Sequence, residues 1–347
     1  MVRRREFILA GSGLLMTAKS LLADSILVSE DPRISEFDLQ SLEGRYTSVK
    51  DFFVRNHFGI PAASSLQSLA ISGEVAKPLA ISPQALQKLK ERKLDAVLEC
   101  AQNQTGPLAL ASNGLWEGWT LHDILALARP SAKARSLLLL GADGFQRRIQ
   151  LEQVSPQALL ATKLNHQRLT PEHGAPWRVL LPGLFGMQSV KWLKQIEIVA
   201  TPLALNTDEY AESIKGPDGK VEYKALPPVL VKSVITYPVR GQVLHPGTVT
   251  LRGVAWSGQG RVAVVEISAD GGKTWRLAKL DPAGRYGWAT WHYTVTIIGT
   301  GVAEFAVRAV DENGLQQPAT RDPSRLDHYA NNTIERVQFV VQPPPSI

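Results

Sequence analysis

The chain contains one cysteine, Cys100, among its 347 residues. A single cysteine cannot form an internal disulfide or build the Cys-x-x-Cys-His motif that attaches a haem covalently, so both features are excluded. The chain also lacks a basic stripe with interleaved aromatic side chains, although its net charge is +6. We therefore expect no nucleic-acid partner, and small anions or an acidic protein fit the positive balance better. No apolar run is long enough to span a bilayer comfortably, so we expect no membrane span in the mature chain.

The first 23 residues have the pattern of an export signal. Arg3, Arg4 and Arg5 precede an apolar run at residues 7–18 that is too short for a membrane helix. The sequence Arg-Arg-Glu-Phe-Ile-Leu at residues 4–9 resembles the twin-arginine signature, which directs folded proteins to the periplasm. We therefore predict a twin-arginine signal peptide at residues 1–23 and a periplasmic location. The alternative is a basic, frayed N-terminus on a cytosolic protein.

A chain of this length exceeds what one hydrophobic core usually supports, so we expect two domains. Residues 45–205 mix short apolar strands with helical segments, which indicates an α+β domain. Residues 206–228 are polar and rich in Lys, Gly and Pro, which predicts a linker or an excursion across the surface. Residues 229–345 carry about seven strand patterns at the spacing of an all-β, immunoglobulin-like sandwich.

Local signals place several elements in the first domain. Strands are expected at residues 68–75, 96–101, 136–140, 158–163 and 178–181. Ser82 before Pro83 predicts the start of a helix that ends near Lys93. Thr120 predicts the N-cap of a second helix, over residues 121–128.

In the second domain the strand patterns are separated by turn signals. They lie at residues 229–237, 248–256, 261–269, 274–280, 286–296, 303–310 and 336–341. Asp270-Gly271-Gly272 predicts a hairpin turn between two of them. Alternation in residues 304–309 predicts that Phe305, Val307 and Ala309 share one buried face.

Cys100 ends an apolar strand pattern and is followed by a loop that contains Asn103. A lone cysteine is more often a small buried hydrophobic residue than a functional group. A thiolate at a strand end can also coordinate a soft, high-valent metal, and one thiolate suffices when an organic dithiolene supplies the other sulfurs. Residues 100–103 resemble the Cys-Ala-Gly-Asn segment of the sulfite oxidase family, with Gln102 in place of glycine. The resemblance implies that Cys100 is the catalytic protein ligand to molybdenum and that Asn103 contacts the cofactor.

A second segment, residues 52–61, places Arg-Asn-His between phenylalanines and a proline. Alone, Arg-Asn-His would more often be an exposed loop. Arginine and histidine can donate to anionic oxygens, and the flanking residues hold an extended segment rigid. The segment is similar to the family's run that lies against the pterin and the molybdenum. This implies that Arg55, Asn56 and His57 bind the cofactor and that Arg55 also takes part in catalysis.

A third cluster follows the family's order His-Gly-x-Pro-x-Arg and then Val-Lys-Trp-Leu, at residues 173–178 and 190–193. Pyranopterin ends in a phosphate, and basic side chains with backbone amides near glycines suit a phosphate cradle. An aspartate before a glycine, such as Asp143, by itself indicates only a turn. The resemblance implies cofactor contacts for Asp143, His173, Arg178, Ser189, Val190 and Lys191.

The chain departs from the family around the substrate. Gln104 and Thr105 stand where the family commonly has a basic pair, and Phe145 falls at the position of the family's tyrosine near the reactive oxo group. Residues 327–332 lack the arginine that the family carries before its paired asparagines. Arg147, Arg148 and Arg325 are the candidates to replace these charges, and we assign Arg147 and Arg148 to the catalytic site.

The resemblance covers residues 45–198 and resumes in the sandwich, which looks like the family's molybdenum-cofactor dimerisation domain and implies a homodimer. It implies a molybdopterin-dependent oxidoreductase that oxidises sulfite or a related small sulfur compound by oxo transfer. The electrons would pass to a separate c-type cytochrome. Two alternatives remain open, a reductase acting on a sulfoxide and a non-catalytic binding protein with a degenerate cofactor fold. Because missing arginines weaken the capture of a dianion, we expect sulfite to be a poor substrate.

Overall fold

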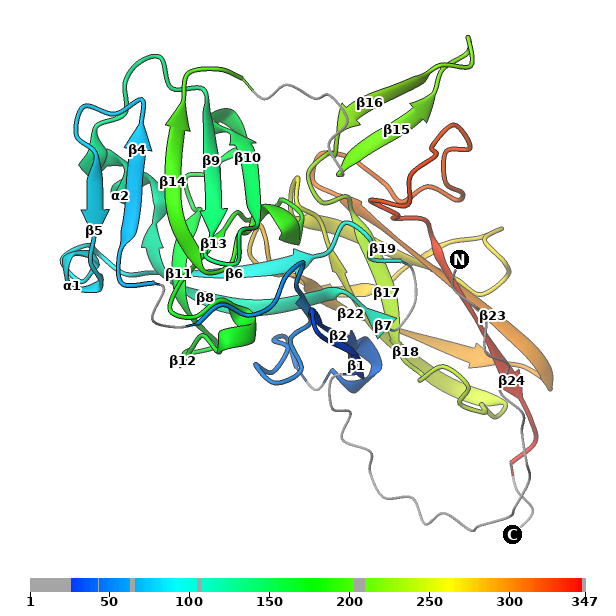
Figure 1. Ribbon diagram of the computed structural model, residues 1–347. Helices are drawn as coiled ribbons and strands as arrows, with labels where there is room; N and C mark the ends of the chain where they lie inside the picture. The colour runs from blue at the N-terminus through cyan, green and yellow to red at the C-terminus, as the bar shows by residue number, and fades with distance from the viewer. Residues whose placement is uncertain (1–25, 43, 63–65, 105–107, 203–209, 345–347) are drawn as a thin grey trace.

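The computed structural model describes residues 26–42, 44–62, 66–104, 108–202 and 210–344. The predicted signal peptide at residues 1–23, and Thr105, lie outside these residues. Within them the α-helices are α1 (Pro83–Leu86) and α2 (Leu121–Ala128), so strands dominate both domains (Figure 1). The first domain therefore contains less helix than the α+β expectation implied. No helix in this part of the chain is both long and apolar enough to cross a membrane.

Three sheets form the first domain. One has the order β10-β9-β14-β4-β5, with β4 (Leu69–Gly73), β5 (Leu79–Ile81), β9 (Ser136–Gly141), β10 (Gln146–Gln150) and β14 (Leu193–Val199). The second has the order β12-β11-β8-β6, with β13 paired to β11; its strands are β6 (Arg92–Glu99), β8 (Ala111–Thr120), β11 (Leu159–Leu164), β12 (Gln167–Arg168) and β13 (Arg178–Leu180). The third joins β1 (Ile26–Glu30), β2 (Arg33–Asp38), β3 (Val54–Arg55) and β7 (Leu108–Ala109).

The two helices begin where their N-cap residues predicted, but one of them is shorter than expected. Thr120 caps α2 as predicted, because its side-chain oxygen accepts from the Asp123 amide at 3.1 Å. Ser82 likewise caps α1, but the prediction that this helix runs to Lys93 is wrong, since it ends at Leu86. Arg92 already begins β6, which pairs with β8 along its whole length. Strand pairing across the sheet therefore overrides the helical pattern.

The second domain is a sandwich of two four-stranded sheets. One is ordered β17-β18-β22-β21, with β17 (Lys232–Tyr237), β18 (Gly247–Trp256), β21 (Lys279–Asp281) and β22 (Ala289–Ile297). The other is ordered β20-β19-β23-β24, with β19 (Val262–Ser268), β20 (Arg276–Leu277), β23 (Gly301–Asp311) and β24 (Glu335–Val341). Phe305, Val307 and Ala309 lie in the core that both sheets share, as predicted. Asp270 closes the predicted turn by accepting from the amides of Lys273 and Thr274.

Residues 206–228 contain structure that their composition did not suggest. Strands β15 (Ala211–Lys215) and β16 (Val221–Ala225) form a hairpin that projects from the body of the molecule (Figure 1). Strand β15 is attached along its length to the loop before β24, because the Ser213 amide donates to Asp327 at 2.9 Å and the Lys215 amide donates to the Ser324 carbonyl at 2.9 Å. This attachment fixes the position of Tyr210, the residue before β15.

One hydrophobic core extends across the boundary between the domains. Phe52 and Trp116 of the first domain belong to the same cluster as Val234, Trp256 and Trp288 of the sandwich. The three tryptophans are at most 1% exposed. Burial of apolar surface is favourable by roughly 25 cal/mol per Å², so the two domains pack as one unit. A pocket, described below, lies beside this shared core.

Candidate active site

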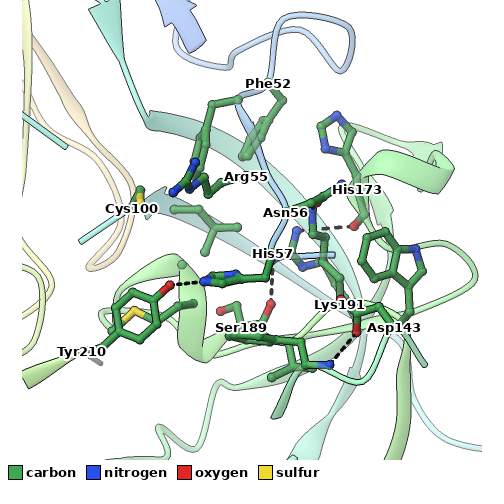
Figure 2. A pocket seen from close by; sticks show the side chains of 18 residues that line it. Phe52, Arg55, Asn56, His57, Cys100, Asp143, His173, Ser189, Lys191 and Tyr210 are labelled. Carbon is green, nitrogen blue, oxygen red and sulfur yellow. Dashed lines mark hydrogen bonds between the residues drawn. The ribbon is translucent and has the colours of Figure 1, made fainter. Parts of the chain in front are cut away.

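A pocket opens between the C-terminal end of β6, the segment that follows β3, and the loops on either side of β13. The space between its walls is about 710 Å³, with the open solvent at its mouth included. Most of the site residues predicted from the sequence line it, namely Arg55, Asn56, His57, Cys100, Asp143, His173, Arg178, Ser189, Val190 and Lys191. Figure 2 shows Cys100 and Arg55 at one end and His173, Lys191 and Asp143 at the other.

Cys100 stands directly after β6, where its amide donates to the Leu110 carbonyl at 2.8 Å. Its side chain is 9% exposed and lines the pocket. Burial raises the pKa of the Cys100 thiol, and the positive charge of Arg55 opposes this rise. The described residues contain no group of three or more His, Cys, Asp or Glu side chains that could hold a metal ion. Cys100 is the one cysteine of the chain, so it supplies the one thiol in the lining of this pocket.

Arg178 and Lys191 bring two buried cationic groups to the other end of the pocket. Arg178 donates from Nη2 to the Ser189 carbonyl at 2.7 Å. Lys191 donates to the Glu172 carbonyl at 2.9 Å and to the side-chain oxygen of Asn56. Among the described residues, Arg178 Nε and Asn56 Nδ2 are buried without a hydrogen-bond partner. Because buried unpaired donors are unfavourable, these atoms indicate an acceptor that a bound molecule supplies.

Burial sets the protonation of these groups. It lowers the pKa of Lys191 well below its usual value, and repulsion from Arg178 adds to the effect. It lowers the pKa of Arg178 to about 9, which leaves this side chain protonated at neutral pH. It lowers the pKa of His173 to about 4, so the ring is neutral at pH 7 and its Nε2 donates to the Val49 carbonyl at 2.9 Å. An anion between Arg178 and Lys191 would offset the desolvation of both cations.

Tyr210 lines the same pocket, and it is not among the residues predicted from the sequence. Its hydroxyl forms a hydrogen bond with Nε2 of His57 (Figure 2). The His57 ring in turn stacks on Phe145, with ring centroids 4.5 Å apart, and the Arg147 guanidinium lies over the Tyr210 ring at 4.9 Å. Tyr210 falls in a stretch with the composition of a linker, so no local signal marked it. The hairpin and its anchoring loop bring it to the site.

Two family models match the chain in order along the sequence. The oxidoreductase molybdopterin binding domain matches residues 57–205. The Mo-co oxidoreductase dimerisation domain matches residues 224–341. Among curated relatives, sulfite oxidase of Gallus gallus is 29% identical over 85% of this chain and 73% of its own length. The chain belongs to the sulfite oxidase family.

Two further proteins are similar to this chain. An NADH nitrate reductase of Brassica napus is 30% identical over 84% of this chain, which spans 38% of that longer protein. The crystal structure of the sulfane dehydrogenase SoxCD from Paracoccus pantotrophus superposes with a TM-score of 0.82 at 28% identity. The match covers 95% of this chain and 92% of that one. The fold of this sulfite oxidase family member is thus shared over nearly its whole length.

The cofactor of this sulfite oxidase family member is molybdopterin with molybdenum, and the pocket fits it. Cys100 would supply one protein thiolate, and the dithiolene of the cofactor would supply further sulfur ligands. The unpaired donors of Arg178 and Asn56, with Lys191 beside them, suit the anionic end of the pterin. Asp143 lines the pocket as predicted, and its oxygen also accepts from the Phe145 amide at 3.1 Å, which is the turn-forming role.

Two predicted site residues lie elsewhere in this family member. Asn103, predicted to contact the cofactor, is not among the residues that line the pocket; its amide nitrogen donates to Glu99 at 2.9 Å and its oxygen accepts from the Leu110 amide at 2.9 Å. Arg148, predicted to be catalytic, forms hydrogen bonds with other groups. Its guanidinium donates to Ser136 at 3.0 Å and to the Thr201 carbonyl at 2.7 Å, outside the pocket lining.

The remaining arginine candidates of this family member are held by other groups. Arg325 pairs with Asp327 at 2.7 Å and with Glu212 at 2.5 Å, and it is not among the residues that line the pocket. Arg147 stacks on Tyr210 at the edge of the pocket and is not among the residues that line it. Gln104, at the position of a basic residue in the family, donates to the His328 carbonyl at 3.2 Å. Arg55 is therefore the arginine nearest to Cys100 in the pocket lining.

Proposed function

We propose that this protein oxidises a small sulfur compound by oxo transfer, with Cys100 as the protein ligand to molybdenum. The observation that carries the proposal is that the Cys100 thiol shares one pocket with the unpaired donors of Arg178 and Asn56. When bound, the cofactor would supply two-electron oxygen-atom transfer, with the electrons leaving one at a time. The direction of oxidation rests on the sulfite oxidase and sulfane dehydrogenase relatives.

The chain's own residues divide into two groups in this proposal. Arg178, Lys191 and Asn56 bind the anionic end of the pterin and exclude water from it. Arg55 and the pair of His57 and Tyr210 face the substrate beside Cys100. Arg55 offsets the charge of an anionic product, and the Tyr210 hydroxyl can donate a hydrogen bond to its oxygen.

The first test is the molybdenum and pterin content of the purified protein. We expect about one molybdenum and one pterin per chain, because the pocket retains one thiol and a cationic cradle. Metal analysis by mass spectrometry, together with fluorescence of the oxidised pterin, measures both. A well-folded protein purified from a molybdenum-replete host without either component would favour the non-catalytic binding protein.

The substrate class follows from the cations that the pocket does not present. Sulfite is a mixture of monoanion and dianion near neutral pH, and Arg148 and Arg325 are bound to other groups. A less charged sulfur compound, such as a sulfane, loses less from their absence. The sulfane dehydrogenase relative agrees with this preference. We therefore propose that a sulfane, thioether or similar neutral compound is the better substrate.

We expect kcat/KM for sulfite to lie at least tenfold below that for the best neutral sulfur compound. A lost hydrogen bond to a buried partner typically contributes about 1–3 kcal/mol, and 1.4 kcal/mol is a factor of ten. Steady-state assays with an artificial one-electron acceptor measure this ratio, and the Phe145→Tyr variant should raise kcat/KM for sulfite. Fast sulfite turnover by the wild type, unchanged in Phe145→Tyr, would contradict the proposal. If the enzyme only reduces a sulfoxide with electrons from a reduced carrier, it is a reductase.

Export, carrier and assembly complete the proposal. We propose that residues 1–23 direct the folded protein to the periplasm, that a c-type cytochrome accepts the electrons, and that the second domain forms a homodimer. Replacing Arg4 and Arg5 by lysine should retain the protein in the cytoplasm, since the signature requires the arginine pair. Cell fractionation measures this, with a Lys19→Arg variant as control. Normal periplasmic yield of the double-lysine variant would overturn the twin-arginine assignment.

A further inference from the structure

A fully buried ion pair crosses the domain boundary one residue before Cys100. Lys232, the first residue of β17, donates to Glu99 Oε1 at 2.7 Å, and the two side chains are 2% and 3% exposed. Trp256 donates its indole N–H to Glu99 Oε2 at 2.8 Å, and Asn103 donates to Oε1 at 2.9 Å. Both carboxylate oxygens of Glu99 are thus occupied, two of the donors coming from the second domain.

Strand alternation explains why this carboxylate points away from the pocket. Leu98 and Cys100 both line the pocket, so Glu99 between them faces the opposite side, towards the sandwich. Asn103 then closes a turn on Cys100, because its amide donates to the Cys100 carbonyl at 2.9 Å. Glu99 therefore precedes this turn in the chain and also accepts a hydrogen bond from Asn103 at its other end.

Stability alone is a weak reason for this arrangement. A buried ion pair must overcome the desolvation of both charges, and well-packed apolar residues of similar size are often equally stabilising. Side chains that orient a metal ligand, by contrast, commonly change metal affinity or activity about 10–100-fold when they are removed. The second domain also holds the turn by its backbone, since the Ala330 amide donates to the Ala101 carbonyl at 2.8 Å.

We propose that Glu99 is a positioning residue through which Lys232 and Trp256 of the second domain fix the orientation of the Cys100 sulfur. This deepens the proposed function, because it rests on Cys100 as the molybdenum ligand. Docking of the second domain thereby becomes a condition for correct metal geometry in the first. Asn103 belongs to the same unit, which accounts for its place away from the pocket.

Two neighbouring tryptophans supply a matched test on the holoenzyme. Trp256 and Trp288 are both buried, their rings are 6.1 Å apart, and each donates one indole N–H across the boundary, Trp256 to Glu99 and Trp288 to the Arg45 carbonyl at 2.6 Å. Trp256→Phe should change the electron paramagnetic resonance parameters of the Mo(V) state and lower molybdenum content about tenfold. Trp288→Phe should lower Tm by a similar amount, but it should leave the Mo(V) parameters and the molybdenum content unchanged. Identical metal spectra and content in the two variants would overturn the proposal.

The ion pair allows stability and positioning to be separated. Glu99→Gln and Lys232→Met each leave one buried charge unpaired and should lower Tm, whereas the double variant leaves none and should regain most of it. The Mo(V) spectrum of the double variant should remain altered, because the pair no longer holds the turn. A double variant with restored Tm and a wild-type spectrum would reduce Glu99 to a structural role. A wild type without molybdenum would instead refute the proposed function itself.

Discussion

Cys100→Ser should lower molybdenum-dependent turnover by more than 100-fold. Loss of a group that only orients a metal ligand commonly changes affinity or activity about 10–100-fold, so loss of the ligand itself should exceed that range. A hydroxyl is a harder and weaker donor than a thiolate, and it stays protonated at neutral pH. Turnover per folded chain and metal content per chain are the two measurements.

The pterin content of the Cys100→Ser variant serves as an internal control. Serine is close to cysteine in size, and Lys191 at the far end of the pocket is untouched. The variant should therefore retain much of its pterin and a Tm near that of the wild type. Full metal-centred activity with serine at this position would show that Cys100 is only a buried hydrophobic residue of the core.

Lys191→Met should reduce bound pterin by about tenfold or more. The lysine side chain donates to the side-chain oxygen of Asn56, whose amide nitrogen has no partner, and a charge-assisted hydrogen bond typically contributes about 1.5–3 kcal/mol. In the cofactor-free protein the free energy of unfolding should stay constant or rise, because burial lowers the pKa of Lys191 and opposes its charge. Pterin fluorescence and denaturant unfolding measure the two effects.

Arg148→Met is the matched control for this change. It removes a cation of similar size from the same domain, but its guanidinium binds Ser136 and Thr201 outside the pocket. Its pterin content should equal that of the wild type. Equal loss of pterin in both variants would show that retention responds to net charge rather than to the cradle, and unchanged pterin in Lys191→Met would remove this residue from the cofactor site.

The sequence predicted those parts of the site that lie within continuous segments. Arg55, Asn56 and His57 occupy three successive positions, and the segments around Arg178 and Lys191 have a fixed order, so their shared pocket could be anticipated. Side-chain direction could not. Asn103 and Arg148 belong to the expected segments, yet each points to partners outside the pocket that only the folded chain brings near.

Long-range contacts account for the other omissions. Tyr210 meets His57 across 153 positions of sequence, and no periodicity or motif in its own segment reports that contact. The prediction that the helix after Ser82 runs to Lys93 is wrong for a related reason. The backbone of residues 92–99 forms its hydrogen bonds with β8 rather than within a helix. In the sandwich, where neighbouring strands pair and alternation marks the core, the expected strands and the observed ones agree closely.

The Glu99 carboxylate also has a consequence for the order of events during biosynthesis. Its partner Lys232 is 133 residues further along the chain, and Trp256 is 157 residues further. At a synthesis rate of about 5–20 residues per second, Lys232 is made roughly 7 to 27 seconds after Glu99. During that interval the Cys100 turn lacks two of its holding groups. Molybdenum loading should therefore follow completion of the chain, so a ribosome-bound first domain would be a poor acceptor for the cofactor.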